Sequence, residues 1–341
     1  MAAAASSPDE SSARRDLADS KWLFSPGIDL LLISILLWPV ILLVCVWGGT
    51  DALSGIGFWQ VYFVTTPHRW ITLVIVFLDR DRFGQRPVSF VALALAVVIL
   101  CLGVRVSTGT LTCLLTVDYL WNGWHFASQH HGIYRIYGRQ AQARRGTPGG
   151  NAVQRHGFAA RVAMRGFVLY VIARIAQWSW SLPEWEAVLT HVDWFVLTLP
   201  CLLVARELVA RTATSLACVA YLASVLVLYT SLLLAAHYQR PDLVLILTTL
   251  SALFHATEYL TIVTQVVRRK HLDRPSGCGV MSFLAPRWGF TLLTFMMVLG
   301  LGSSFAEAHW MKTWLLLNVI VAFLHYGYDG MIWKSRRSGT A

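Results

Sequence analysis

Long apolar runs recur along the chain from Ile28 to Trp333, and they constrain the fold more than any other feature. Each run is close to the roughly 20 residues that a helix needs to cross a bilayer. Only 13% of the residues are charged, whereas an average soluble domain carries roughly 25%. The sequence therefore predicts an all-α fold, a polytopic transmembrane helical bundle.

We predict about ten spans, the fifth of which is the least apolar because Arg161, Arg165 and Arg174 interrupt it. The spans are placed at 28–47, 57–78, 88–104, 110–131, 162–180, 192–210, 214–236, 242–266, 287–304 and 311–333.

Lysine and arginine cluster before the first span and after every even-numbered one, and the alternate loops are poor in both. Cytoplasmic loops carry such an excess, so we expect both termini to be cytoplasmic. The predicted organisation is a disordered tail 1–25, a transmembrane domain 26–333 with a basic cytoplasmic loop 136–160, and a second tail 334–341. The expected location is a cell inner membrane.

The net charge of +10 does not indicate nucleic acid, because the basic residues lie in short clusters between apolar runs. That pattern favours membrane lipid as the partner. The six cysteines are scattered and form no CxxC pair, so neither a disulfide framework nor a zinc site of cysteines is predicted.

Six of the eleven histidines fall within even-numbered spans. One on each of four spans, namely His68, His125, His255 and His325, lies between 9 and 13 residues before the next basic residue. This places these four at one depth, roughly 14–20 Å of helix from the cytoplasmic end. Histidine is the commonest metal ligand. We predict a metal site from His68, His125, His130, His131, His255 and His325. The other five, including His237, are interpreted as interfacial.

Carboxylates accompany these histidines at helical spacing, three or four residues away on the same face. Glu258 follows His255 by three residues and Asp329 follows His325 by four, so both are predicted ligands. Asp118, Asn122 and Gln129 are expected to orient the ligating histidines by hydrogen bonds.

His130 and His131 point about 100° apart on a helix, so both reach one site only if the helix ends near Gly132. Pro67 is expected to disturb the second span just before His68.

A set of imidazoles and carboxylates suits iron, copper, zinc or manganese, and the number of ligands would serve one or two ions. No cysteine lies close to this set in the sequence, which argues against an iron–sulfur cluster. Two irons in a buried apolar pocket would activate oxygen for attack on a lipid C–H bond.

The spacing HxxxxHH over His125, His130 and His131, beside single histidines on other spans, resembles the membrane histidine-box enzymes, which are fatty-acid desaturases, hydroxylases and alkane monooxygenases. The boxes HxxxH and HxxHH of that family are absent. The single histidines are also similar to those of membrane carotene-cleaving dioxygenases. The resemblance implies a non-haem iron oxygenase that acts on an apolar, lipid-like substrate and takes electrons from a donor.

Three other interpretations remain open. Two histidines on different spans could bind haem axially. The same groups could line a proton or metal-ion pathway of a transporter. They could also join helices by hydrogen bonds alone.

Overall fold

The computed structural model of the chain describes residues 22–144, 151–179, 183–209, 216–273 and 280–332. Nearly all of these residues are helical, and no strand occurs among them, which confirms the all-α fold class. The C-terminal tail 334–341 and residues 1–21 of the N-terminal tail lie outside the described residues. The end of that tail is ordered, because Leu23 and Phe24 donate their backbone N–H groups to the Asp29 carboxylate.

The chain forms two compact units. The first consists of the residues up to Val44 together with Phe126–His255, and the second consists of Cys45–His125 and the residues from Ala256 onward. The chain passes from one unit to the other inside three helices, which are α3 (Trp38–Trp59), α7 (Thr112–Arg144) and α12 (Pro241–Asp273).

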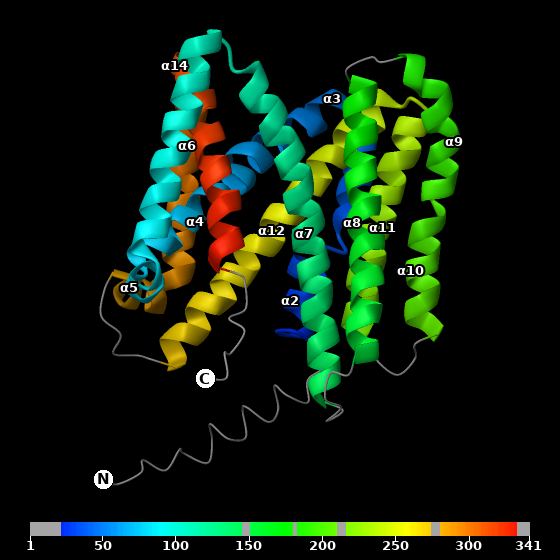
Figure 1. Ribbon diagram of the computed structural model, residues 1–341, viewed down its shortest axis with the longest axis horizontal. Helices are drawn as coiled ribbons and strands as arrows, with labels where there is room; N and C mark the ends of the chain where they lie inside the picture. The colour runs from blue at the N-terminus through cyan, green and yellow to red at the C-terminus, as the bar shows by residue number, and fades with distance from the viewer. Residues whose placement is uncertain (1–21, 145–150, 180–182, 210–215, 274–279, 333–341) are drawn as a thin grey trace. The chain divides into compact units, whose positions relative to one another are not determined.

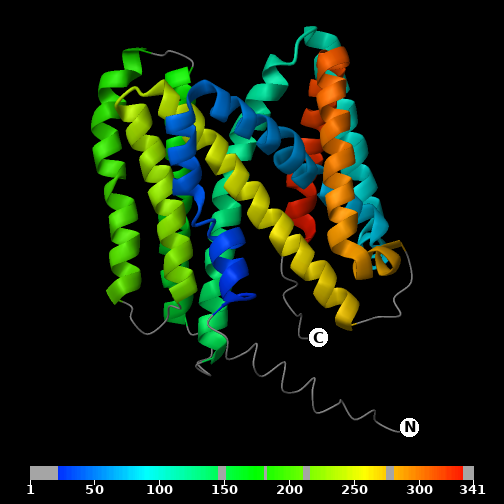
Figure 2. The same cartoon turned by 180° about the vertical axis from the view of Figure 1, so that it is seen from behind.

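In the first unit, α8, α10 and α11 pack against one another in pairs, and α9 packs on all three. Figures 1 and 2 show these helices side by side. The helix α11 is the most buried of them, with twelve hydrophobic residues of the core on it. The elements particular to this unit are α2 (Pro26–Ile28), η1 (Asp29–Ile33), α8 (Asn151–Ser179), η3 (Pro183–Trp185), α9 (Glu186–Val196), α10 (Thr198–Val209) and α11 (Leu216–His237).

In the second unit, α14 packs on α4, on α6 and on the π-helical turn η2, and Figures 1 and 2 show α4, α6 and α14 running side by side. Val97 and Cys101 of α6 meet Val319 and Phe323 of α14 in one buried cluster. The elements particular to this unit are η2 (Gln60–Thr65), α4 (Thr66–Leu78), α5 (Arg80–Gln85), α6 (Pro87–Thr108), α13 (Val280–Leu284), η4 (Ala285–Arg287) and α14 (Trp288–Ile332).

The outer face of α6 is apolar. Its exposed side chains include Leu95, Ile99, Leu102 and Val106, which follow one another at intervals of three or four residues and so share one face. A soluble helix turns such a face inward. Outward-facing apolar rows are what hydrocarbon requires, so the protein is a membrane-embedded helical one.

Six helical stretches among the described residues are long and apolar enough to cross a membrane, and two of these have 53 residues each, Pro26–Leu78 and Val280–Ile332. A stretch of that length has enough residues for two crossings. Helical geometry breaks within each, at Gly49 with φ 63° and at Trp310 with φ −138°. Both breaks fall between predicted spans, whereas the number of ten spans stays a prediction.

Two expectations about local structure are wrong. The helix α7 does not end near Gly132 but continues to Arg144, and α8 already begins at Asn151, so most of the predicted loop 136–160 is helical. The reason lies in the sequence RQAQAR, because arginine, glutamine and alanine are strong helix formers that a search for apolar runs overlooks. A π-helical turn, η2, ends at Thr65, two residues before Pro67, and the expected kink at Pro67 stays a prediction.

Candidate metal centre

Two histidines of the second unit point their ring nitrogens at each other. Nε2 of His125, on α7, lies 3.0 Å from Nε2 of His325, on α14. Asp329 is one helical turn beyond His325, and its Oδ2 lies 3.8 Å from each of these two nitrogens. The three side chains each offer a ligand atom within 4.8 Å of the others. His325 is fully buried, and the other two are at most 9% exposed.

A chain of hydrogen bonds behind His325 fixes which of its nitrogens carries the proton. The Tyr259 hydroxyl lies 2.7 Å from Asp329 Oδ1, and an ionised carboxylate can only accept, so Tyr259 donates. The Tyr259 oxygen therefore accepts from Thr72 Oγ1, 2.6 Å away. Thr72 has then used its proton and accepts from Nδ1 of His325 at 2.7 Å.

The consequence is that His325 carries its proton on Nδ1 and turns a bare lone pair on Nε2 toward His125. Either a proton on His125 or a cation must lie between the two nitrogens. Two nitrogens bound to one metal ion at about 2.0–2.2 Å would be separated by about 3.0–3.5 Å, which agrees with the observed contact. Thr72 and Tyr259 thus hold a metal-ligating tautomer in place, as hydrogen bonds behind metal-bound histidines do.

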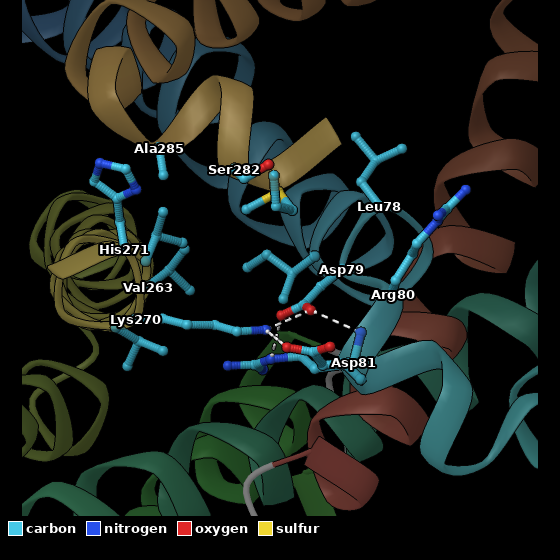
Figure 3. A pocket seen from close by; sticks show the side chains of 14 residues that line it. Leu78, Asp79, Arg80, Asp81, Val263, Lys270, His271, Ser282 and Ala285 are labelled. Carbon is cyan, nitrogen blue, oxygen red and sulfur yellow. Dashed lines mark hydrogen bonds and ion pairs between the residues drawn. The ribbon is translucent and has the colours of Figure 1, made fainter. Parts of the chain in front are cut away.

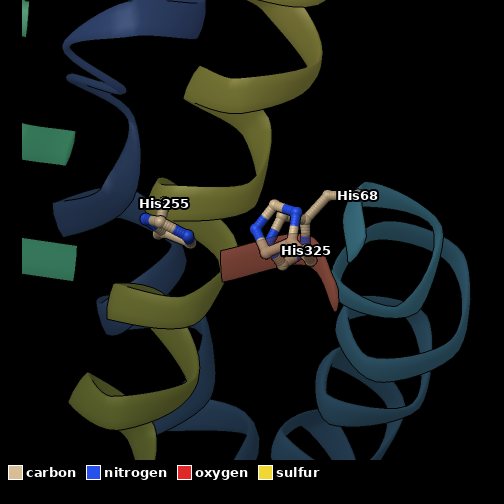
Figure 4. A group of neighbouring side chains, drawn as sticks. All are labelled: His68, His255 and His325. Atoms are coloured by element: carbon tan, nitrogen blue, oxygen red, sulfur yellow. The ribbon is translucent and has the colours of Figure 1, made fainter. Parts of the chain in front are cut away.

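His68, on α4, is prepared in the same way. Its Nδ1 is hydrogen-bonded to the Thr65 carbonyl at the end of η2, so Nδ1 carries the proton and Nε2 carries the lone pair. Its ring centroid lies 4.9 Å from that of His325 at nearly a right angle, and Figure 4 shows the two rings close together. Their ligand atoms lie within 4.8 Å of each other. The structure thus brings together the predicted residues His68, His125, His325 and Asp329.

The predicted supports Asp118 and Asn122 act on a neighbouring tyrosine. Tyr326 donates its hydroxyl to Asp118 Oδ1 at 2.9 Å and faces Asn122 Oδ1 at 3.1 Å. Its ring lies against the His125 ring, with centroids 5.0 Å apart. The expected role of Asp118 and Asn122 is therefore indirect, because they orient the aromatic wall beside His125. Arg69 completes this group, with Nη1 3.9 Å from Asp118.

His255 lies on α12, at the residue where this helix leaves the first unit (Figure 4). Within that unit its ring stacks on Phe126, with centroids 3.9 Å apart. Gln129 donates to the His255 carbonyl at 2.8 Å, not to its imidazole, so the support predicted from Gln129 takes a different form. Glu258 is fully buried further along α12. Ligation by His255 and by Glu258 stays a prediction.

His130 and His131 are buried on an uninterrupted helix and turn to different surroundings. Nδ1 of His130 faces the Tyr221 hydroxyl at 3.0 Å and Nε2 faces the Tyr229 hydroxyl at 3.5 Å, which occupies both ring nitrogens. Neither histidine belongs to a group of potential ligands among the residues that the structure describes. These contacts do not support metal ligation by His130 or His131.

The sequence analysis missed three residues that shape the centre, and each lies next to a predicted one. Thr72 follows His68 by four residues, Tyr259 follows His255 by four, and Tyr326 directly follows His325. A search for hydroxyl groups one helical turn from each histidine would have found the first two.

A second buried polar network lies in the first unit and was also missed. Arg174, on α8, donates to Asp193 at 3.2 Å and to Glu186 at 2.6 and 3.1 Å, both on α9. Asp193 also accepts from the Tyr170 hydroxyl at 2.7 Å and from His237 Nδ1 at 3.0 Å. His237, interpreted above as interfacial, therefore takes part in this polar network at the end of α11.

No protein-family model matches the chain, and no curated protein and no solved structure is detectably similar to it.

Proposed function

We propose that the chain is a multi-pass membrane metalloenzyme, of an inner membrane, that holds a metal ion between His125, His325 and Asp329. The observation that carries the proposal is the 3.0 Å contact between two Nε2 atoms with one carboxylate beside both. The hydrogen-bond chain through Thr72 and Tyr259 supports it, because this chain leaves a lone pair of His325 directed at the same point.

Iron(II) is the metal that we propose. Two histidines and one carboxylate with open positions are the ligand set of non-haem iron oxygenases. His68, with its Nε2 lone pair, is available as a further ligand to this ion or to a second one. Zinc, copper and manganese accept imidazole and carboxylate ligands too, so the experiment below includes them.

Haem is less well supported than a bare ion at this position. Axial ligands of haem stand on opposite faces of the porphyrin, with the iron between them. The Nε2 atoms of His125 and His325 are only 3.0 Å apart and share one side with Asp329, which is the arrangement of neighbouring ligands on one ion.

The proposed reaction is hydroxylation or desaturation of an apolar membrane substrate. Bound iron would supply dioxygen activation. In a hydroxylation, one oxygen atom of dioxygen is inserted into a C–H bond and the other is released as water. Forming this water requires two electrons and two protons, and a donor protein or cofactor supplies the electrons. The chain itself supplies a water-poor, buried site whose ligand tautomers are fixed by Thr72, Tyr259 and Thr65.

The test is metal analysis of protein purified in detergent without a metal-affinity tag. We expect iron in near-stoichiometric amount in the wild type and its loss in His125→Ala, His325→Ala and Asp329→Asn. The matched control is His191→Ala, because His191 is an exposed histidine bonded only to its own helix at Ala187. Parallel analysis of His255→Ala tests its predicted ligation.

Chromatographic behaviour and thermal stability of each variant establish that it is folded. Unchanged metal content in folded His125→Ala and His325→Ala would overturn the proposal. A Soret band in the visible spectrum of the wild type would favour haem, and metal-ion flux through reconstituted vesicles would favour a transporter.

A further inference from the structure

A cavity of about 70 Å³ lies in the second unit, at the end of α4 and beside α5, α12 and α13. Its walls are apolar, with Ile75 and Leu78 on one side and Val263, Val266 and Met281 on the other. Charged groups occupy the helix ends around it. The residues at the ends of the membrane-crossing stretches, Leu78 and His271, both line this cavity, which places it at the membrane surface.

The lining of the cavity contains three cationic side chains and two carboxylates, so its charge is positive. Lys270 reaches across from α12 to Asp79 and Asp81, at 2.6 and 2.9 Å (Figure 3). Arg82 pairs with the other oxygen of Asp79 at 3.3 Å. Both carboxylates are thus paired with Lys270 or Arg82. Arg80 has no ion-pair partner among the described residues.

A buried ring nitrogen beside these charges is also unsatisfied. Nδ1 of His271 is buried and has no hydrogen-bond partner among the described residues. Buried polar atoms of this kind are rare in proteins unless a ligand or water satisfies them.

We propose that this cavity binds the anionic head of a membrane amphiphile, with the first part of its apolar chain against Ile75, Leu78 and Val266. Basic pockets at the ends of membrane helices attract anionic head groups, and the apolar wall below the charges excludes a fully polar anion. The shared chemistry is an oxyanion on a hydrocarbon chain, either a fatty-acid carboxylate or a phospholipid phosphate.

The cavity lies on the same helices as the metal centre. Thr72 and Asp79 of α4 are seven residues apart, and Tyr259 and Lys270 of α12 are eleven apart, which is about 10–16 Å of helix. Ile75 and Val263 belong to the same buried cluster as Tyr259. If the function proposed above is right, the bound amphiphile is the substrate, and the reacting carbon lies well down its chain.

The experiment is native mass spectrometry of the full chain, in detergent, with oleate, phosphatidylglycerol or phosphatidylcholine added. We expect retention of oleate or phosphatidylglycerol, which identifies a carboxylate or a phosphate head, and little retention of phosphatidylcholine. Val266→Trp fills the cavity and should abolish retention. Val298→Trp is the control, because Val298 is 67% exposed on the apolar face of α14.

Arg80→Gln tests the charge without filling the cavity, and we expect about tenfold weaker retention of the anionic amphiphile. Equal retention of phosphatidylcholine, or retention by folded Val266→Trp at the wild-type level, would overturn the proposal. Iron measured in the same preparations separates the two proposals. Anion retention in protein that holds no metal supports the anion-binding cavity and overturns the metal centre. Bound metal without anion retention supports the metal centre and overturns the anion-binding cavity.

Discussion

The buried polar groups of the two units differ in how donors and acceptors are paired. In the first unit, the fully buried Arg174 is matched by Asp193 and Glu186, and the carboxylate of Asp193 also accepts from Tyr170 and His237. Donors meet acceptors throughout this network. Buried charges paired in this way join helices, here α8, α9 and α11.

In the second unit, two atoms of the same kind face each other. Nε2 of His125 and Nε2 of His325 are both potential acceptors, and the carboxylate of Asp329 adds a third acceptor beside them. Such an arrangement requires either a proton on one of the two nitrogens or a cation between them. Burial alone therefore does not distinguish a cluster that only joins helices from a candidate binding site. The two are distinguished by whether each buried donor faces an acceptor.

The largest expected effect comes from breaking the neutralised network of the first unit. Arg174→Ala leaves Asp193 buried without its cation, and removing one partner of a buried ion pair costs about 3–5 kcal/mol. We expect a large fall in the free energy of unfolding, measured by denaturation in mixed detergent micelles, with unchanged iron content in the protein that remains folded.

The control is Arg240→Ala, which removes an ion pair to Asp242 that is more than half exposed. Exposed pairs contribute about 0–1 kcal/mol. If Arg174→Ala and Arg240→Ala destabilised the protein equally, the first network would not be the helix clamp that its geometry indicates.

A smaller effect is expected where the metal centre is disturbed without removing a ligand. Thr72→Val keeps the shape of the side chain but removes the acceptor for Nδ1 of His325 and the donor to Tyr259. Loss of such a supporting hydrogen bond weakens metal affinity by about 10–100-fold. The loss of metal affinity is measured by competition with a chelator of known affinity.

Thr72→Ser retains the hydroxyl and should restore most of the affinity, which a merely structural role of the side chain would not produce. Thr249→Val is the matched control, because Thr249 is half-buried and its hydroxyl donates to the Leu245 carbonyl of its own helix. Wild-type affinity in Thr72→Val would show that the tautomer of His325 is not fixed by this chain.

Most of the architecture could be predicted from the sequence because apolar runs directly report where hydrocarbon or core surrounds a helix. The exceptions are the polar helices. Residues of α7 beyond Gly132 and the start of α8 are helical although they are rich in arginine and glutamine. Hydropathy carries no information on helices that are held by propensity and by tertiary contacts.

The candidate site was predictable as far as it depends on helical spacing. His325 and Asp329 are one turn apart in the sequence, and their meeting with His125 agrees with the common depth that was predicted from the distance to the next basic residue. The direction of each ring did not follow, since His130 lies only five residues from His125 yet faces Tyr221 and Tyr229. Nor could Arg174 be matched to Asp193, because an ion pair between two helices depends on their packing, which no local pattern records.

The smallest expected effect concerns packing rather than polar groups, and it extends the comparison to the backbone of the second unit. A methyl group added at Gly300 of α14 would lie 2.5 Å from the Phe63 ring of η2, whereas one at Gly302 would meet nothing within 4 Å. Gly300→Ala must therefore shift the Phe63 ring or α14 where they meet at the turn that precedes His68, at a cost of about 1–3 kcal/mol.

Gly302→Ala should be neutral or slightly stabilising, because alanine is the better helix former by about 1 kcal/mol. We therefore expect opposite signs for two substitutions two residues apart, read as shifts of the thermal unfolding midpoint. Gly300→Ala should also lower iron affinity, because the helix it displaces carries His325 and Asp329. Wild-type stability and iron affinity in Gly300→Ala would mean that the metal centre does not depend on close contact between α14 and η2.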